Sequence, residues 1–282
     1  LINRFKFKKY NSERMMNMKK VFVVFFSFLL VCLLLTGNQK VEATTIEFTE
    51  DTAVNINEFH SFTNVVVFIR FADEIDYVAP YDLAYYINMF NGVNMLSLRY
   101  YYLEVSYNQL TIDSIVVSGV DTIIYYTDEH NRNYYQPYDL GNPYGYEDDD
   151  EAAIREHTLL KKAADWVEEN NYIDESVNLD VNDDGDIDSV TFLVSGEDEG
   201  WYSTLWPHKW SLNTYYDYSA GDYEPDAPTI NGKHLWDYTF ELLGDSTEYE
   251  NKVDVAVLAH ETFHLISAPD LYHYFDYGWI TA

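Results

Sequence analysis

The 282-residue chain carries 17 basic and 48 acidic residues, which gives it a formal net charge of −31. Nucleic-acid binding depends on Lys and Arg displacing counterions from phosphates, so this acidity excludes a nucleic-acid partner. Acidic chains that stay disordered are poor in aromatic residues, whereas this one has 27 Tyr, 16 Phe and 6 Trp. The composition therefore predicts a folded protein with a sizeable core.

The basic residues gather at the N-terminus, where residues 1–43 hold eight of them, and the rest of the chain carries −37. The apolar run 21–35 follows, with Ser27 as its polar member. Fifteen residues are few for a spanning helix, which needs about twenty, and fit the core of a signal peptide. We interpret residues 18–43 as a signal peptide and residues 1–17 as an untranslated upstream extension. An uncleaved membrane anchor is the alternative.

Cys32, the single cysteine, lies inside this apolar run. After cleavage the chain would hold no thiol, so disulfides, thiolate zinc sites and cysteine nucleophiles are excluded from the mature protein. We expect a secreted or cell-surface domain that makes no membrane contact once processed and is stabilised by core packing and by metal ions.

Apolar patterns along residues 44–282 predict one mixed α/β (α+β) domain, since helices and strands alternate without repeats or a long linker. The apolar side of one amphipathic helix should contain Ile154, Leu160, Ala163, Ala164 and Val167. In chain order we expect a strand buried on both faces at 65–71, helical spacing over 81–107, strands at 110–117 and 122–126, a helix at 150–170, a strand at 189–195 and a helix at 253–266.

The last of these helices carries the sequence H-E-x-x-H at residues 260–264. Positions i and i+4 lie on one face of a helix, so His260 and His264 can hold one zinc ion, and Glu261 is placed to take a proton from a water on that ion. The competing interpretation is two solvent-exposed helix histidines beside a solvated glutamate, because five-residue motifs also occur by chance.

A catalytic zinc ion requires a third protein ligand, and Asp270 follows ten residues after His260. Residues 260–270 resemble the metzincin pattern H-E-x-x-H-x-x-G-x-x-H/D, in which a Gly turns the chain back toward the metal, and Ser267 stands at the Gly position. A residue other than Gly can adopt the left-handed conformation at modest cost. Asp270 is therefore the predicted third ligand. A plain turn residue after Pro269 is the alternative.

A second cation site is predicted in the segment D-x-N-x-D-G-D-x-D. Oxygen ligands at alternate positions around one Gly are typical of calcium loops, but Thr191 stands where an EF-hand needs Glu. The alternative is a solvated acidic turn. The expected calcium ligands are Asp180, Asn182, Asp184, Asp186 and Asp188.

Several ordered blocks make the chain resemble the immune inhibitor A-like family of secreted bacterial zinc metallopeptidases. The blocks are the strand at 65–71, the helix end S-L-R-Y-Y-Y-L-E-V-S-Y at 97–107, D-G-D-I-D at 184–188, L-W-P-H-K-W at 205–210, and residues 260–272 with their P-D-L-Y ending. The resemblance implies a metzincin-like zinc peptidase domain with an upper mixed sheet. It also implies a zinc helix with His260 and His264, the base Glu261, and structural calcium.

Two features depart from that family. Ser267 replaces the Gly of the H-E-x-x-H-x-x-G-x-x-H/D pattern, and the chain ends at Ala282, before the lower subdomain with its Met-containing turn. We therefore expect a domain that is incomplete at its C-terminus. His208 is shared only as part of a block and receives no catalytic role.

The sequence as a whole favours a secreted zinc-dependent endopeptidase that cleaves proteins or peptides, with zinc as catalytic and calcium as structural cofactor. A catalytically inactive, calcium-stabilised binding or adhesion domain on the same scaffold is the alternative. A carbohydrate-binding domain is a third possibility, suggested by the Tyr-rich loops at 124–146 and 215–223. Cleavage specificity and oligomeric state leave no signature in the sequence.

Overall fold

A computed structural model describes residues 60–93, 96–200, 202–245 and 252–269. The predicted signal peptide and Asp270 lie outside these ranges. Within them, no helix is both long enough and apolar enough to cross a membrane. Contacts between residues divide the chain at Ile56, and every described residue belongs to the second unit.

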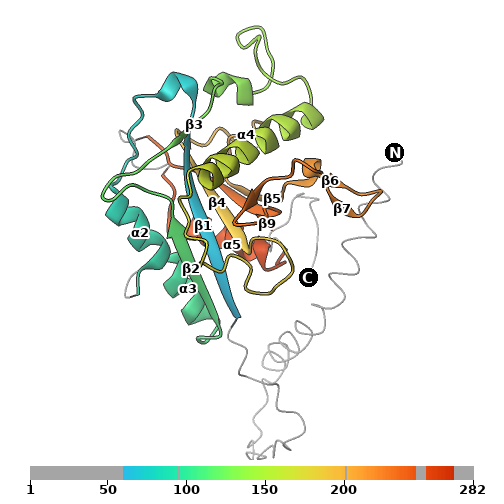
Figure 1. The fold of residues 1–282 in the computed structure, drawn as a ribbon. Coiled ribbons are helices and arrows are strands. Elements are labelled where there is room, and N and C mark those ends of the chain that lie inside the picture. The colour runs from blue at the N-terminus through green and yellow to red at the C-terminus, as the bar shows by residue number, and fades with distance from the viewer. Residues whose placement is uncertain (1–59, 94–95, 201, 246–251, 270–282) are drawn as a thin grey trace, which may run out of the picture. The chain divides into compact units, whose positions relative to one another are not determined.

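A mixed sheet forms the centre of this unit (Figure 1). Its strand order is β2-β1-β4-β10-β5, and the two-residue strand β3 also pairs with β1. Neighbours are parallel throughout except at β5, which runs antiparallel to β10 along one edge. The strands are β1 (His60–Arg70), β2 (Leu110–Val116), β3 (Tyr126–Thr127), β4 (Ser189–Val194), β5 (His208–Ser211) and β10 (Asp237–Leu242).

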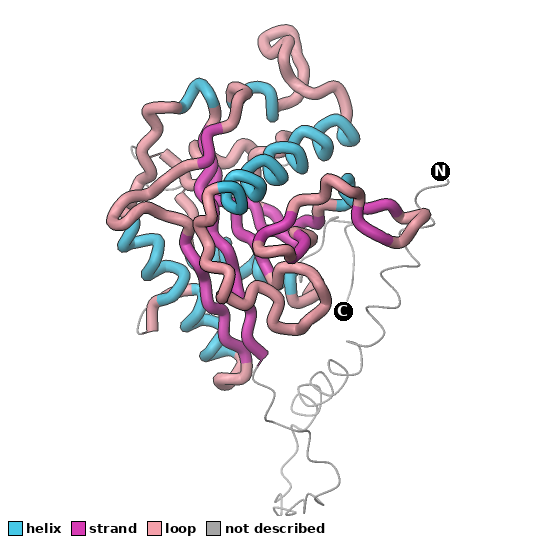
Figure 2. The backbone as a smooth tube through the Cα atoms, in the orientation of Figure 1, coloured by secondary structure: helices cyan, strands magenta, loops and turns pink. Residues whose placement is uncertain are grey.

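Helices cover both faces of this sheet, as the tube in Figure 2 also shows. One face packs against α4 (Asp149–Glu169), and the other packs against α2 (Leu83–Asn91), α3 (Leu98–Val105) and α5 (Val255–Leu265). Short elements complete the described chain. They are the 3-10 helices η2 (Ala72–Glu74), η3 (Arg132–Tyr135) and η4 (Asn213–Tyr215), and the two hairpins β6–β7 (Tyr216–Asp217, Asp222–Tyr223) and β8–β9 (Thr229–Ile230, Lys233–His234).

Strand β1 confirms the expectation that its apolar run is buried on both faces. All five residues from Val65 to Ile69 are inaccessible to solvent, with Val65, Val67 and Ile69 facing α4 and Val66 and Phe68 facing the other helices. Each such side chain contributes about 1.5–3 kcal/mol of burial free energy. A continuous apolar run, rather than an alternating one, is what a central parallel strand requires.

Other expectations need correction. The helical spacing over 81–107 belongs to two helices, α2 and α3, and a new N-cap separates them: the Ser97 hydroxyl accepts a hydrogen bond from the Tyr100 amide at 3.0 Å. The strand expected at 122–126 is reduced to β3. Ile154, expected on the buried side of α4, is 55% exposed, because the buried side runs through Ala152 and Leu159. The other residues expected on that side are buried: Leu160, Ala163, Ala164 and Val167. Strands β5 and β10 were not predicted.

Candidate functional site

Helix α5 begins at a well-formed N-cap. The Asp254 carboxylate accepts hydrogen bonds from the amides of Ala256, at 2.8 Å, and Val257, at 3.0 Å. These amides have no acceptor within the helix, so the cap stabilises the first turn by about 1 kcal/mol. The buried side of the helix contains Leu258, Ala259, Glu261 and Thr262 and faces the sheet.

The two predicted histidine ligands lie together on α5. Their Nε2 atoms are 3.3 Å apart, and their rings are nearly perpendicular, at 84°, with centroids 4.8 Å apart. A tetrahedral zinc ion with Zn–N bonds of about 2.0–2.1 Å holds two ligand nitrogens about 3.3–3.4 Å apart. The separation of the two nitrogens therefore fits a shared zinc ion.

The chain just after α5 fixes the orientation of His264. Its Nδ1 lies 2.8 Å from the Ala268 carbonyl oxygen, which can only accept, so Nδ1 carries a proton. In the neutral ring Nε2 is then the atom with a lone pair, and this is the atom that faces His260. A carbonyl that accepts from the other ring nitrogen is a common support of histidine metal ligands.

Ser267 makes this carbonyl available, because its φ of 68° places it in the left-handed region. The amide of Ser267 donates to His264 at 2.9 Å, and the amide of Ala268 donates to Phe263 at 3.2 Å. This pair of bonds is a Schellman motif, in which Gly usually occupies the left-handed position. The turn expected at Ser267 is thus formed without Gly, and it ends α5 before Pro269 is reached.

Glu261 is buried, with 6% of its surface exposed, on the side of α5 that faces the sheet. One of its carboxylate oxygens, Oε1, lies 3.8 Å from Nε2 of His260. A buried carboxylate beside a histidine of this pair is a group of the kind that can serve as a general base. No group of three or more His, Cys, Asp or Glu side chains suited to a metal occurs within the described ranges, and the third expected ligand, Asp270, lies outside them.

The predicted calcium loop is held by hydrogen bonds of its own. Asp188 accepts from the amides of Thr63, at 2.8 Å, and Val181, at 3.1 Å. The carboxylate of Asp180 forms an ion pair of 2.7 Å with Lys233, a residue that the sequence analysis did not single out. Burial, together with the charges of Asp180 and Asp184, raises the pKa of Asp188 above its ordinary value, although the two amide bonds oppose this.

The remaining loop residues contact each other and one aromatic side chain. Asn182 donates to the Asp184 carboxylate at 3.0 Å, and the Tyr223 hydroxyl donates to Asp186 at 2.5 Å. A calcium ion coordinated by Asp180 would have to displace the Lys233 ammonium from it. The structure therefore shows an acidic loop with many internal partners, and calcium binding stays a prediction.

Sequence analysis did not identify a buried ion pair between α4 and β5. His208 is 5% exposed, and its Nε2 lies 3.0 Å from Glu156, while its Nδ1 lies 2.7 Å from the Trp206 carbonyl. Both nitrogens face acceptors, so both are protonated. Burial opposes the charge of His208, but Glu156 outweighs it and raises the pKa of His208; burial likewise opposes the charge of Glu156, but His208 and the Tyr238 hydroxyl lower the pKa of Glu156.

A second unexpected group is Glu241 on β10. It is fully buried, and neither carboxylate oxygen has a hydrogen-bond partner in the described part of the chain. Burial, and then the charges of Glu261 and Asp254, raise the pKa of Glu241 well above its ordinary value. The sequence could have indicated this buried acid if the otherwise apolar run F-E-L-L at 240–243 had been recognised as a strand.

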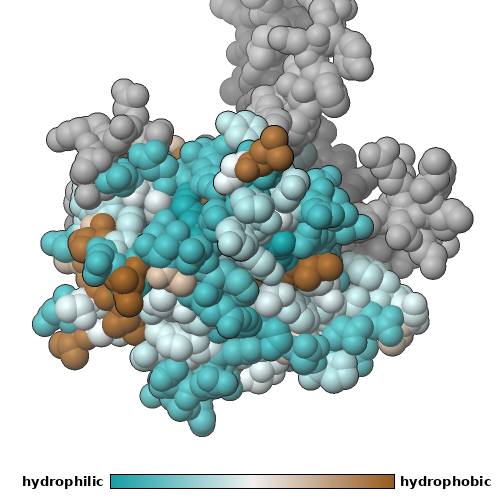
Figure 3. All heavy atoms as spheres, turned by 90° about the horizontal axis from the view of Figure 1, so that it is seen from above, coloured by the Kyte–Doolittle hydropathy of each residue, from teal (hydrophilic) through white to brown (hydrophobic). Residues whose placement is uncertain are grey.

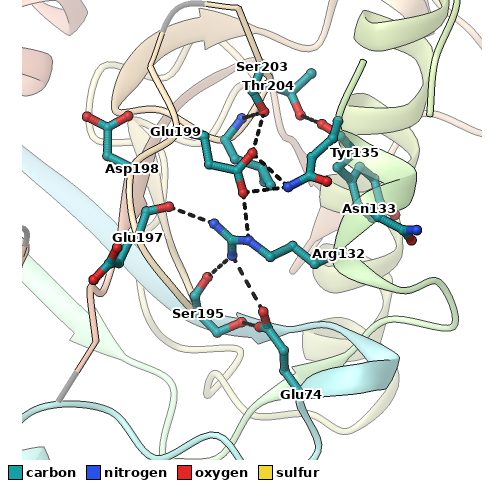
Figure 4. Close-up of polar contacts among 12 residues, drawn as sticks. Glu74, Arg132, Asn133, Tyr135, Ser195, Glu197, Asp198, Glu199, Ser203 and Thr204 are labelled. Atoms are coloured by element: carbon teal, nitrogen blue, oxygen red, sulfur yellow. Dashed lines mark hydrogen bonds and ion pairs between the residues drawn. The ribbon is translucent and has the colours of Figure 1, made fainter. Parts of the chain in front are cut away.

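The carboxyl end of the sheet holds a different polar cluster, centred on Arg132 (Figure 4). The Arg132 guanidinium donates to Glu199 at 2.8 Å and to the carbonyls of Ser195 and Glu197, each at 2.6 Å. Gly196 permits this approach, because a Cβ there would lie 2.3 Å from Nη1 of Arg132 and its φ is +86°. The cluster joins η3 to the end of β4.

An acidic cavity of about 740 Å³ opens beside this cluster, with Asp73, Asp76, Glu197, Asp198 and Asp245 among its lining residues. Figure 3, drawn from above the view of Figure 1, shows a mainly hydrophilic face with a few separate hydrophobic patches. Arg132 is the basic member of the described lining residues and is already bound to the protein's own acceptors. Arg132 therefore acts as a structural link between η3 and the end of β4.

Comparison with models of known protein families gives no match, and comparison with curated proteins gives no significant relative. The function must accordingly be argued from the site itself.

Proposed function

We propose that the protein is a secreted zinc-dependent endopeptidase of the metzincin-like type, with His260, His264 and Asp270 as zinc ligands and Glu261 as the general base. The observation that carries the proposal is the geometry at α5. Two Nε2 atoms face each other 3.3 Å apart, a carbonyl fixes the orientation of one ring, and a buried carboxylate lies next to the pair.

The mixed sheet supports the same assignment. The resemblance implies an upper mixed sheet over a zinc helix, and α5 packs beneath the strands β10 and β5. This arrangement leaves the edge strand β5 close to the helix that carries the histidines. Export of the protein is proposed from residues 18–43 alone, and peptide substrates are proposed from the chemistry of the site.

When bound at such a site, zinc makes water acidic enough to act at neutral pH and polarises a carbonyl group. The Glu261 carboxylate would accept a proton from the attacking water and then donate that proton to the leaving amine nitrogen. Its burial against the sheet holds the carboxylate in place, since α5 is fixed at both ends by the Asp254 cap and the Ser267 turn. Tyr102 adds a third anchor by donating to the Ala259 carbonyl at 2.7 Å.

Zinc content and casein hydrolysis, measured together on purified protein, test the proposal. The wild-type chain should bind one zinc ion, and Glu261→Gln should keep that zinc while losing about 10²–10⁴-fold or more in hydrolysis rate. His264→Ala should lose both zinc and hydrolysis. Glu175→Gln, at an exposed glutamate, is the matched control and should behave as wild type.

Absence of zinc from the wild-type protein would contradict the proposal. Bound zinc without hydrolysis in the full-length protein would instead favour the binding or adhesion domain that is the alternative from the sequence.

Calcium is proposed as a structural cofactor at residues 180–188. Alternating acidic residues supply suitable ligands there, although Lys233 now neutralises Asp180.

A further inference from the structure

Glu241 lies where the sheet meets the zinc helix. Along β10, Tyr238, Phe240 and Leu242 face α4, so Glu241 and its neighbour Leu243 face α5. The apolar cluster on this face includes Leu193, Leu243, Leu258 and Ala259. The Glu241 side chain has no exposed surface, and neither oxygen has a hydrogen-bond partner in the described chain.

A glutamate in such a place cannot readily carry its charge. Burying an ionised carboxylate without a partner costs several kcal/mol in proteins, whereas the neutral acid costs much less. Burial thus favours the form of Glu241 that holds a proton. The group is a buried acid to which the proposed reaction assigns no role.

The charged groups of the surrounding elements favour the same protonated form. From α5, Glu261 and Asp254 act on Glu241, and both are acidic. Strand β4, with the sequence S-V-T-F-L-V, presents no titratable side chain. On β5, Lys209 forms an ion pair with Asp237 at 2.7 Å, and His208 pairs with Phe240 in the register and lies on the opposite face.

We propose that Glu241 is a positioning residue for the zinc helix: held as a neutral acid, it lets α5 pack against β10 with Glu261 on the buried side, and its ionisation loosens that contact. The proposal rests on the proposed function only where Glu261 is called the general base. The contact between α5 and β10 and the buried state of both glutamates do not depend on it.

The proposal predicts a definite dependence of stability on pH. In the unfolded chain a glutamate loses its proton near pH 4.3, whereas folded Glu241 keeps its proton to a higher pH. The folded state then binds one more proton than the unfolded state, so stability is fully present below about pH 4.3 and falls as pH rises. The folding equilibrium constant should fall by up to about tenfold per pH unit until folded Glu241 ionises.

Denaturant unfolding of the metal-free chain from pH 5 to 7 tests this. Glu241→Gln keeps the shape of the neutral acid without a titratable proton, so the ratio of its folding constant to that of wild type should rise by up to about tenfold per pH unit. If the amide of the Glu241→Gln variant packs poorly in this site, Glu241→Leu, which also has no titratable proton, should show the same rise of the ratio with pH. A ratio independent of pH for both variants would overturn the proposal.

Glu156 is also buried, but it is paired with His208 at 3.0 Å and is not a matched control for Glu241. Glu156→Gln would itself alter the pH dependence, because Glu156 is what raises the pKa of His208. Glu175→Gln, at an exposed glutamate, therefore serves as the control for pH, and the ratio of its folding constant to that of wild type should not change with pH. In Glu261→Gln the pH dependence assigned to Glu241 should persist, because burial rather than Glu261 is its larger cause.

Hydrogen exchange locates the effect on the helix. After correction for the intrinsic exchange rate, the α5 amides of wild type should lose protection with rising pH before those of β1 and β4, and in Glu241→Gln they should not. Equal loss in α5 and in the central strands would contradict a positioning role. Because no zinc or substrate is present, failure here leaves the peptidase proposal standing, and failure of the zinc assay leaves this result standing.

Discussion

Two buried glutamates, on opposite faces of the same sheet, differ in the partners that surround their carboxylates. Glu156 lies between His208 and the Tyr238 hydroxyl, and these partners lower its pKa despite its burial. Glu241 lies among leucines beside a second acid, and its pKa is raised. Two buried glutamates thus have pKa values shifted in opposite directions, because the partners decide the sign of the shift.

The largest expected effect comes from removing the Glu156 carboxylate that pairs with His208. Glu156→Gln would leave the His208 imidazolium buried opposite an amide, which should cost about 3–5 kcal/mol of unfolding free energy. Urea denaturation near pH 7 measures the loss. His208→Phe, added to this variant, removes the stranded charge and should recover part of the stability.

A double variant as unstable as Glu156→Gln would show that the charge of His208 is not the cause.

The pH range in which the Glu156–His208 pair stabilises the fold follows from the pKa shifts of its two members. The raised pKa of His208 contributes stability that is lost as pH rises through it, and the lowered pKa of Glu156 contributes stability that is lost as pH falls through it.

An intermediate effect is expected in the acidic loop, which contains both a carboxylate with an ion-pair partner and a carboxylate near like charges. Asp180 is paired with Lys233, whereas Asp188 is half-buried near other carboxylates and its pKa is raised. Calcium binding in the loop should stabilise the fold by about 1–3 kcal/mol at saturation, measured as a higher melting temperature than in chelator.

Lys233→Met removes the competing ammonium and should enlarge that calcium effect. Magnesium at the same concentration is the control for ionic strength. A melting temperature indifferent to calcium in both proteins would mean that the loop is a hydrogen-bonded acidic turn.

The smallest expected effect concerns the end of α5, which holds Glu261 toward Glu241. Ser267→Gly relieves a left-handed serine and should stabilise the fold by roughly 0.5–1 kcal/mol, part of which is offset by the greater freedom of Gly when unfolded. Thermal unfolding measures it. Ser267→Val should destabilise the fold, because β-branched residues tolerate this conformation poorly. A destabilised Gly variant would indicate that the Ser267 side chain itself holds the turn.

The sequence by itself determined the elements whose signal is local. The continuous run in β1, the helical period of α4 and α5, and the spacing of His260 and His264 each depend on neighbours along the chain, and each corresponds to an element or a close pair in the structure. Where local signals were weak, as for the short strands β5 and β10, tertiary pairing with neighbouring strands decided the structure.

Only the tertiary structure decided the environment of single polar groups. Glu156 and His208 are 52 residues apart, and Glu241 and Glu261 meet only because α5 packs across β10. The carbonyl that orients His264 depends on the left-handed turn at Ser267. A motif fixes which chemical groups share one helix face, but the charge of a buried group depends on desolvation and on partners, which only the packed chain supplies.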